Sequence, residues 1–162
     1  GIVNHGMYVR YHHDVVGVNS RLDSIQAAVL NAKLPLLDSY SKERQNAARK
    51  YSKAFEGHKN IVAPSICDIC DCHVFHQYTL TLNGVDRDGL NLYLAEQGVP
   101  SMIYYPVPAH RQKMFDAFGG SDFNLPVTDW LTERVISLPI HTELDEEQQT
   151  FIVNKVLEYI NR

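Results

Sequence analysis

Two stretches of the chain concentrate side chains that could do chemistry, and the first is a cluster of thiols and imidazoles. Its members are Cys67, Cys70, Cys72, His73 and His76. Thiolates and imidazoles are the ligands that Zn²⁺ prefers, but a structural zinc site needs a tetrahedral set of ligands, and no second pair at zinc-knuckle spacing occurs in the sequence. We therefore expect no bound metal, and a small metal-binding module at these cysteines stays as an alternative.

The second stretch is residues 104–112, which read Tyr-Tyr-Pro-Val-Pro-Ala-His-Arg-Gln. The prolines stiffen a loop that carries phenol, imidazole and guanidinium groups beyond an expected strand, where exposed donors and acceptors can meet a ligand. Ordinary loop packing explains these residues equally well. The sequence also lacks a Gly-x-Ser-x-Gly turn and a glycine-rich phosphate loop, so no reaction follows from local patterns alone.

Composition limits the class of protein. A chain of 162 residues with 44% hydrophobic content can bury the core of one compact domain. The net charge of −4 and the scattered basic residues argue against a nucleic-acid partner, and the apolar runs are far shorter than the roughly 20 residues that span a bilayer. The odd number of cysteines is a poor basis for a disulfide framework, so we expect a cytoplasmic protein without a membrane partner.

Periodicity predicts the elements that must position these groups. Apolar residues recur at helical spacing from Leu22 to Phe55, with an interruption at Pro35, and the charged residues of the second half of this helix predict a solvated face. Residues 73–82 alternate as a strand with Val74 and His76 on its apolar face.

The remaining elements alternate between helix and strand. We expect strands at residues 61–62, 101–105 and 136–138, and helices at 110–118 and 127–135. Asp86 and Asp145 have the position of N-caps for two further helices, the first with Leu90, Tyr93 and Leu94 on its buried face. This order predicts an α/β fold, or α+β in detail, with roughly three to four strands covered by helices.

Four segments together resemble one family. Residues 17–28 read Gly-Val-Asn-Ser-Arg-Leu-Asp-Ser-Ile-Gln-Ala-Ala. They resemble the Gly-x-Asn-x-Arg-Leu-(Asp)-x-x-Gln-Ala-Ala stretch of the DegT/DnrJ/EryC1/StrS family of pyridoxal-phosphate-dependent sugar aminotransferases. The family's later motifs follow in order: His-Val-Phe-His-Gln-Tyr at 73–78, Tyr-Pro-x-Pro-x-His-x-Gln at 105–112, and Ser-Leu-Pro-Ile-His at 137–141.

The resemblance covers nearly the whole chain and implies a domain organisation. Residues 21–162 would form the small C-terminal domain of a fold-type-I aminotransferase, with a short, mostly antiparallel sheet covered by helices. Residues 1–20 would be an irregular arm from a large domain that binds the cofactor. The lysine that forms a Schiff base with pyridoxal 5'-phosphate belongs to that large domain, so we expect no catalytic residue in this chain and no activity from it alone.

The resemblance also implies site residues. Asn19 and Arg21 match the positions that reach the cofactor phosphate of the neighbouring subunit in a homodimer with shared active sites. An amide and a guanidinium suit a phosphate dianion. The alternative is that Asn19 or Ser20 caps the helix that begins near Leu22, with Arg21 solvated.

By the same likeness, a set of aromatic, imidazole and guanidinium groups would contact a nucleotide-sugar substrate. These residues are Arg10, His13, Tyr104, Tyr105 and His110. The intact enzyme would transfer an amino group from glutamate to a keto sugar linked to a nucleotide, for cell-surface polysaccharide or glycoconjugate synthesis. The other alternative is a dimerisation or interaction domain without a ligand of its own.

Overall fold

The computed structural model describes residues 7–9, 12–13, 22–65, 72–112, 119 and 122–162. The chain divides into two compact units, Gly1–Asp38 and Ser39–Arg162, and each is described here by itself. No helix in the described part of the chain has the length and apolar character needed to cross a membrane.

The first unit contains a short antiparallel pair of strands and a helix. The strands β1 (Met7–Val9) and β2 (His12–His13) lie within the stretch that we expected to be irregular. The helix α1 (Ser24–Lys33) begins at Asp23, whose side chain accepts a hydrogen bond of 2.8 Å from the backbone N–H of Gln26. The interruption predicted at Pro35 is confirmed as a 3₁₀ turn, η1 (Leu34–Leu36).

The second unit is built on a three-stranded antiparallel sheet in the order β3-β4-β5. The strands are β3 (Ile61–Val62), β4 (Tyr78–Leu82) and β5 (Val135–Leu138). Tyr78 pairs with Leu138, and Ile61 pairs with Leu82. Alternate side chains of the central strand, those of Tyr78, Leu80 and Leu82, are buried in the core, as the period predicted. The expected fold class is confirmed.

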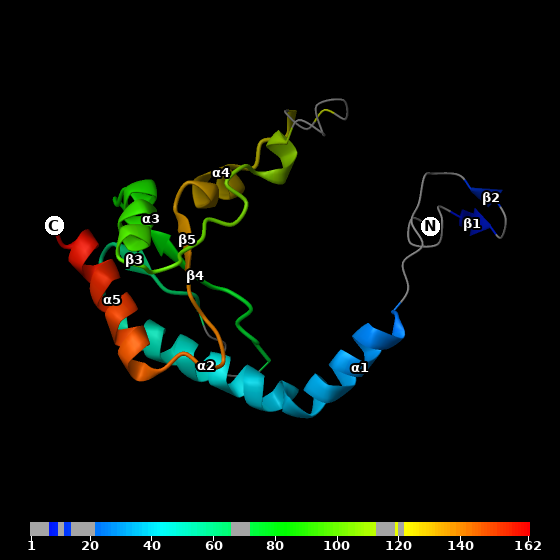
Figure 1. The fold of residues 1–162 in the computed structure, drawn as a ribbon. Coiled ribbons are helices and arrows are strands. Elements are labelled where there is room, and N and C mark those ends of the chain that lie inside the picture. The colour runs from blue at the N-terminus through cyan, green and yellow to red at the C-terminus, as the bar shows by residue number, and fades with distance from the viewer. Residues whose placement is uncertain (1–6, 10–11, 14–21, 66–71, 113–118, 120–121) are drawn as a thin grey trace. The chain divides into compact units, whose positions relative to one another are not determined.

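Helices cover this sheet (Figure 1). Those that bury residues against it are α2 (Leu37–Ala54), α3 (Arg87–Glu96) and α5 (Glu146–Ile160). The helix α4 (Pro126–Thr132) and the 3₁₀ turn η2 (Ala109–Arg111) contain no buried residue. The predicted N-caps are confirmed, since Asp86 accepts from the N–H of Gly89 at 3.0 Å and Asp145 from that of Gln148 at 2.7 Å. Gln148 also bonds back to the Asp145 N–H and completes a capping box.

The start of the central strand differs from the prediction. The strand begins at Tyr78 instead of residue 73, because Phe75 turns the backbone with φ 44°. That turn reverses the expected sides: Phe75 is 2% exposed and enters the core, whereas Val74 is 53% exposed and His76 lies at the surface. His76 is therefore not a core histidine.

Polar side chains hold this turn in place. Arg44 of α2 donates from Nη1 to the carbonyls of Phe75 at 3.1 Å and His76 at 3.5 Å. Gln45 donates to the carbonyl of His73 at 3.1 Å, and Nδ1 of His73 accepts from the N–H of Phe75 at 2.9 Å. Arg44 is therefore part of the fold and not of the solvated face to which its charge assigned it.

The other differences lie between residues 100 and 135. Residues 101–105 form no strand; only Met102 bridges to Ser137 of β5, because prolines stand at positions 100 and 106. Of the helix expected at residues 110–118, residues 113–118 lie outside the described residues, and the described start is a 3₁₀ turn, η2, that ends at Gln112 with extended backbone. The next helix ends at Thr132 and β5 begins at Val135, slightly earlier than expected.

Two buried phenols join the helices to the sheet. Tyr51 of α2 donates to the carbonyl of Pro139 at 3.0 Å, and its ring centroid lies 5.0 Å from that of Tyr78. The Tyr78 hydroxyl bonds to the Ser52 hydroxyl at 3.0 Å. Burial raises the pKa of both phenols above their usual value, so both stay protonated and remain available as donors.

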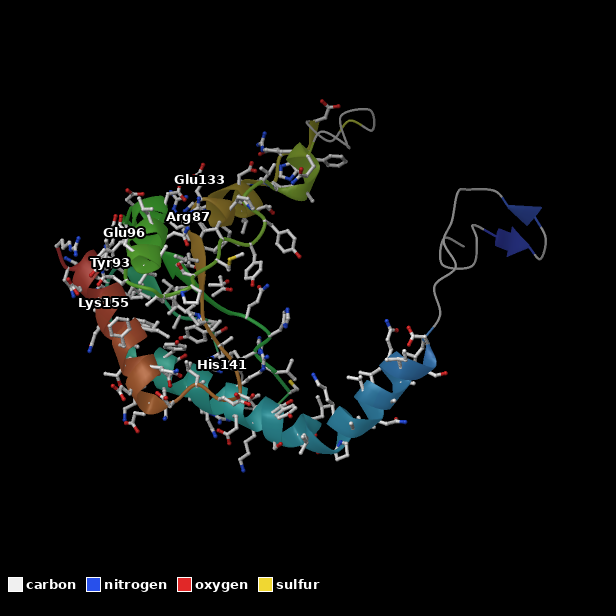
Figure 2. All side chains as sticks on the ribbon, viewed as in Figure 1. Arg87, Tyr93, Glu96, Glu133, His141 and Lys155 are labelled. Atoms are coloured by element: carbon white, nitrogen blue, oxygen red, sulfur yellow. The ribbon has the colours of Figure 1, made fainter. Side chains whose placement is uncertain are left out.

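Helices α3 and α5 approach closely through aromatic rings. The ring centroids of Tyr93 and Tyr159 are 5.4 Å apart, and the guanidinium of Arg162 lies 4.4 Å from the Tyr93 ring. Figure 2 shows Tyr93 of α3 beside Lys155 of α5. The approach leaves no room for a side chain at Gly89, where an added Cβ would collide with the Tyr159 hydroxyl and lie 2.5 Å from Oδ2 of Asp86.

Replacing Arg44 with Met should destabilise the protein, because the carbonyls of the Phe75 turn lose a charged donor while the side chain keeps its length. We expect the free energy of unfolding to fall by about 1–3 kcal/mol in a denaturant titration. Lys42→Met, at an exposed position of the same helix, is the control and should change it little. Equal stabilities of the two variants would contradict the role of Arg44 in holding the Phe75 turn.

Replacing Gly89 with Ala should lower the melting temperature, although alanine favours helices more than glycine does. The collision with Tyr159 and the Asp86 cap costs about 1–3 kcal/mol, which exceeds the helix-propensity gain of about 1 kcal/mol. Circular dichroism melting measures the change, with Glu96→Ala at an exposed position of α3 as the control. A Gly89→Ala variant that melts higher than the original would show that the helices can separate there.

Candidate functional site

Two of the motif segments, and the chain that leads into a third, meet around one small cavity in the second unit. It has a volume of about 110 Å³ and is lined by His76 and Gln77, by Pro100, Met102 and Tyr104, and by residues 137–140. These segments are far apart in the sequence: the first and last belong to the 73–78 and 137–141 motifs, and Tyr104 directly precedes the 105–112 motif. The fold therefore gathers them into a single candidate site.

Hydrogen bonds to β5 fix the segment that carries the tyrosines. The N–H of Met102 donates to the Ser137 carbonyl at 3.0 Å, and the Ser137 N–H donates back at 2.8 Å. The Ser137 hydroxyl also bonds to that of Thr79 on β4 at 2.8 Å. Ser101 adds a hydrogen bond of 2.8 Å to the Asn91 side chain on α3. The chain that leads to the tyrosines is thus tied to both the sheet and a helix.

The two tyrosines of this segment are exposed. Tyr104 lines the cavity and is exposed, and Tyr105 is 81% exposed. Tyr105 has φ 57°, a backbone conformation that residues with a Cβ seldom adopt and that is held by its surroundings where it occurs. Pro106 follows directly and fixes the exit of the chain. An aromatic ring held in solvent by a strained backbone is suited to stacking on a ligand.

His110 is enclosed by an acidic neighbour. Its side chain is 7% exposed, and Nε2 lies 3.4 Å from Oδ1 of Asp129 on α4. Arg111 donates to the same carboxylate with both Nε, at 3.0 Å, and Nη2, at 2.6 Å. These hydrogen bonds, together with the charges of Arg111 and His110, hold the pKa of Asp129 below its usual range, so this carboxylate is ionised at neutral pH.

The structure does not describe the side chains of the other predicted site residues. Asn19, Arg21 and Arg10 lie outside the described residues, and His13 lies in β2. The alternative helix cap can be examined, because Asp23 occupies the N-cap position of α1. Neither Asn19 nor Ser20 is that cap.

The cysteine cluster does not assemble a metal site in the described part of the chain. Cys67 and Cys70 lie outside that part, and Cys72 is disulfide-bonded, which differs from our expectation of unpaired thiols. A sulfur in a disulfide is not a thiolate ligand. Within the described ranges, no group of three or more His, Cys, Asp or Glu residues is arranged to hold a metal ion.

A larger cavity, of about 430 Å³, lies between the end of α3 and the start of α5. Apolar side chains such as Val99, Leu144 and Phe151 provide most of its lining, and His141 also lines it. None of the predicted site residues lines it. The smaller cavity therefore remains the candidate site.

Sequence reasoning missed two residues that organise the site. Asp129 contacts His110 and Arg111 from a helix that follows a further loop, and Arg44 reaches the Phe75 turn from α2. A carboxylate on a short helix and an arginine on a charged helix carry no local signal of such contacts. Only the folded arrangement reveals them.

Comparison with known proteins agrees with these motifs. Residues 2–157 match the DegT/DnrJ/EryC1/StrS aminotransferase family. The chain is 44% identical over 91% of its length to the UDP-N-acetyl-3-dehydro-alpha-D-glucosamine 3-aminotransferase of Acidithiobacillus ferrooxidans, and 40% identical over 96% to the pleiotropic regulatory protein of Geobacillus stearothermophilus. It spans 38% and 41% of the lengths of these relatives.

A solved structure shares both the fold and the sequence pattern. The chain superposes on DesV of S. venezuelae, crystallised in complex with a ketimine intermediate, with a TM-score of 0.82 and 31% identity. The match covers 99% of this chain and 43% of that one. The motifs, the fold and the match over residues 2–157 lead to one conclusion: the chain belongs to the DegT/DnrJ/EryC1/StrS aminotransferase family.

Proposed function

We propose that the complete protein is a pyridoxal-phosphate-dependent aminotransferase that transfers an amino group from glutamate to a keto sugar linked to a nucleotide. This chain is its C-terminal part, with residues 21–162 as the small domain and residues 1–20 as the connection to the large one. The convergence of two motif segments and the chain leading into a third on one cavity carries the proposal, because a shared site explains why segments so far apart in the sequence meet.

The substrate we propose is a nucleotide-linked hexose with a keto group at C3. The name of the Acidithiobacillus ferrooxidans relative, which describes a UDP-linked 3-keto amino sugar, supports this choice. The product would enter cell-surface polysaccharide or glycoconjugate synthesis in the cytoplasm. Glutamate is the amino donor in this proposal.

Asn19 and Arg21 are the residues we propose for the cofactor phosphate. An amide and a forked guanidinium offer several hydrogen-bond donors and a positive charge, and both properties suit a phosphate dianion. The N-cap at Asp23 supports this role, because α1 needs no cap from Asn19 or Ser20. When bound, the cofactor supplies an electron sink for amino transfer, whereas these residues hold and orient it.

The residues that we propose as substrate contacts differ in how much of each side chain is exposed. Tyr104 and Tyr105 present exposed phenols that can stack on or bond to the sugar. His110 can meet the substrate only with the small part of its ring that Asp129 and its other neighbours leave uncovered. Arg10 would pair with an anionic group of the substrate, either a phosphate or a uronate carboxylate. His13 would also contact the substrate.

A homodimer with shared active sites completes the proposal. The stretch of α1 and η1 exposes a run of large apolar side chains, among them Ile25 at 79%, Leu30 and Leu34. Exposed apolar groups in such number are typical of surfaces that another protein surface covers. In this proposal, the covering surface belongs to a second subunit or to the remainder of the complete protein.

Arg21→Ala and Asn19→Ala should weaken cofactor binding in the complete enzyme, with the larger effect for Arg21. Losing charged hydrogen bonds to the phosphate should raise the Kd for pyridoxal 5'-phosphate roughly 10- to 100-fold for Arg21→Ala, measured by absorbance titration of the apoenzyme. Asp23→Ala is the matched control, because it removes the helix cap and costs about 1 kcal/mol of stability without touching the phosphate. Unchanged cofactor affinity in both variants would leave only the interaction-domain alternative.

Glutamate-dependent amination of a UDP-linked 3-keto sugar tests the function itself. We expect the complete enzyme to form the amino sugar and Tyr105→Asn to raise the KM for the sugar by about tenfold, because base or sugar stacking on an aromatic ring is lost. Asparagine tolerates the left-handed backbone at this position, so the change removes the ring and spares the turn. Leu92→Ala, at an exposed position of α3, should leave the KM unchanged. An enzyme that aminates no nucleotide sugar would refute the proposal.

A further inference from the structure

We propose that Asp129 is a positioning residue for substrate binding: its carboxylate holds His110 and Arg111 and thereby fixes the 104–112 segment that carries the exposed tyrosines. This inference rests on the proposed function, since it assigns Asp129 a role in the same site. It does not require Asp129 to touch the substrate.

Arg111 contacts both carboxylate oxygens of Asp129, and His110 lies beside one of them. Oδ1 accepts from Nε of Arg111 at 3.0 Å and lies 3.4 Å from Nε2 of His110, while Oδ2 accepts from Nη2 of Arg111 at 2.6 Å. A two-pronged arginine–carboxylate pair fixes direction as well as distance. One carboxylate therefore restrains consecutive residues of the segment.

The surroundings of His110 make the charge of Asp129 necessary. Nε2 of His110 is shielded from solvent and has no hydrogen-bond partner among the described residues. A buried polar nitrogen without a partner is costly, and a neighbouring carboxylate reduces that cost by attracting its proton. A neutral group in place of Asp129 would attract this nitrogen and the Arg111 guanidinium less strongly, so the segment would be held less firmly.

The segment itself is internally tied, so a restraint at His110 and Arg111 reaches the tyrosines. The N–H of Arg111 donates to the Pro108 carbonyl at 2.9 Å, and the Gln112 side chain donates to the Val107 carbonyl at 3.3 Å. At the other end, Met102 is bonded to Ser137 of β5. Tyr104 and Tyr105 lie between these two anchors.

The helix that carries Asp129 is attached to the rest of the unit. Arg87 of α3 donates to the carbonyl of Thr132, the last residue of α4. Arg134 donates to the Trp130 carbonyl at 3.0 Å, and its guanidinium lies 5.0 Å from the Trp130 ring. A positioning carboxylate is effective only on a fixed element, and these contacts supply that fixed element.

The test compares variants of the complete enzyme. Asp129→Asn keeps the shape and removes the charge, and it should raise the KM for the nucleotide sugar about tenfold while the KM for glutamate and the melting temperature change little. Asp129→Glu keeps the charge and should recover most of the affinity. Glu133→Gln is the matched control: this exposed carboxylate beside the end of α4 pairs with Arg134 at 3.1 Å, and its loss should change neither KM (Figure 2).

Two results would overturn the inference. One is an unchanged KM for the nucleotide sugar in Asp129→Asn, and the other is an equal rise in both KM values, which would indicate general damage. Should Asp129→Asn fail to fold, Arg111→Gln removes the other half of the pair, and the same comparison decides.

A second measurement does not depend on the substrate. Trypsin cleavage after Arg111 should be about fivefold faster in Asp129→Asn than in Glu133→Gln, because the released segment opens more often. Equal cleavage rates in the two variants would contradict the positioning role of Asp129, whether or not a nucleotide sugar binds. Faster cleavage in an enzyme that binds no nucleotide sugar would instead contradict only the proposed function.

Discussion

A single buried hydrogen bond, from the Tyr51 hydroxyl to the Pro139 carbonyl, connects α2 to the chain that leaves the sheet after β5. The Tyr51 ring also contacts Tyr78, the first residue of the central strand. Because a buried carbonyl without a donor is costly, this bond fixes how the Ser-Leu-Pro-Ile segment passes the helix. Arg44 lies two helical turns earlier on α2 and fixes the turn before β4 from the same helix. The arrangement of the cavity therefore depends on α2, although α2 contributes no residue to its lining.

The site combines groups that differ in how they are supported. Ser137 and Leu138 belong to the hydrogen-bond ladder of the sheet, and His76, Gln77, Pro139 and Ile140 lie one or two positions along the chain from its paired residues. Tyr104 and Tyr105 lie on a connecting segment whose restraint comes from side-chain charge and from proline. Rigid strands give precise positions, whereas a loop held at its two ends can adjust to the shape of a ligand.

Sequence reasoning succeeded where the signal is local. Asp86 and Asp145 cap helices through residues three positions later, and Leu90, Tyr93 and Leu94 share a face at helical spacing, so short windows contained the answer. It failed at Phe75, where a long-range hydrogen bond from Arg44 stabilises a positive φ that reverses the inward and outward sides. It also failed at residues 101–105, which have strand-like composition but pair only at Met102, and it could not find Asp129, which meets His110 only after folding. The family motifs supplied what periodicity lacked, because they identify residues by function and not by secondary structure.

The left-handed backbone at Tyr105 also limits how this site can be altered by protein engineering. Valine, isoleucine and threonine branch at Cβ and are strongly disfavoured there, whereas glycine, asparagine and aspartate fit the conformation. A library that randomises position 105 would therefore lose stability most at its β-branched members. Tyr104, which lines the cavity and has no positive φ, carries no such limit.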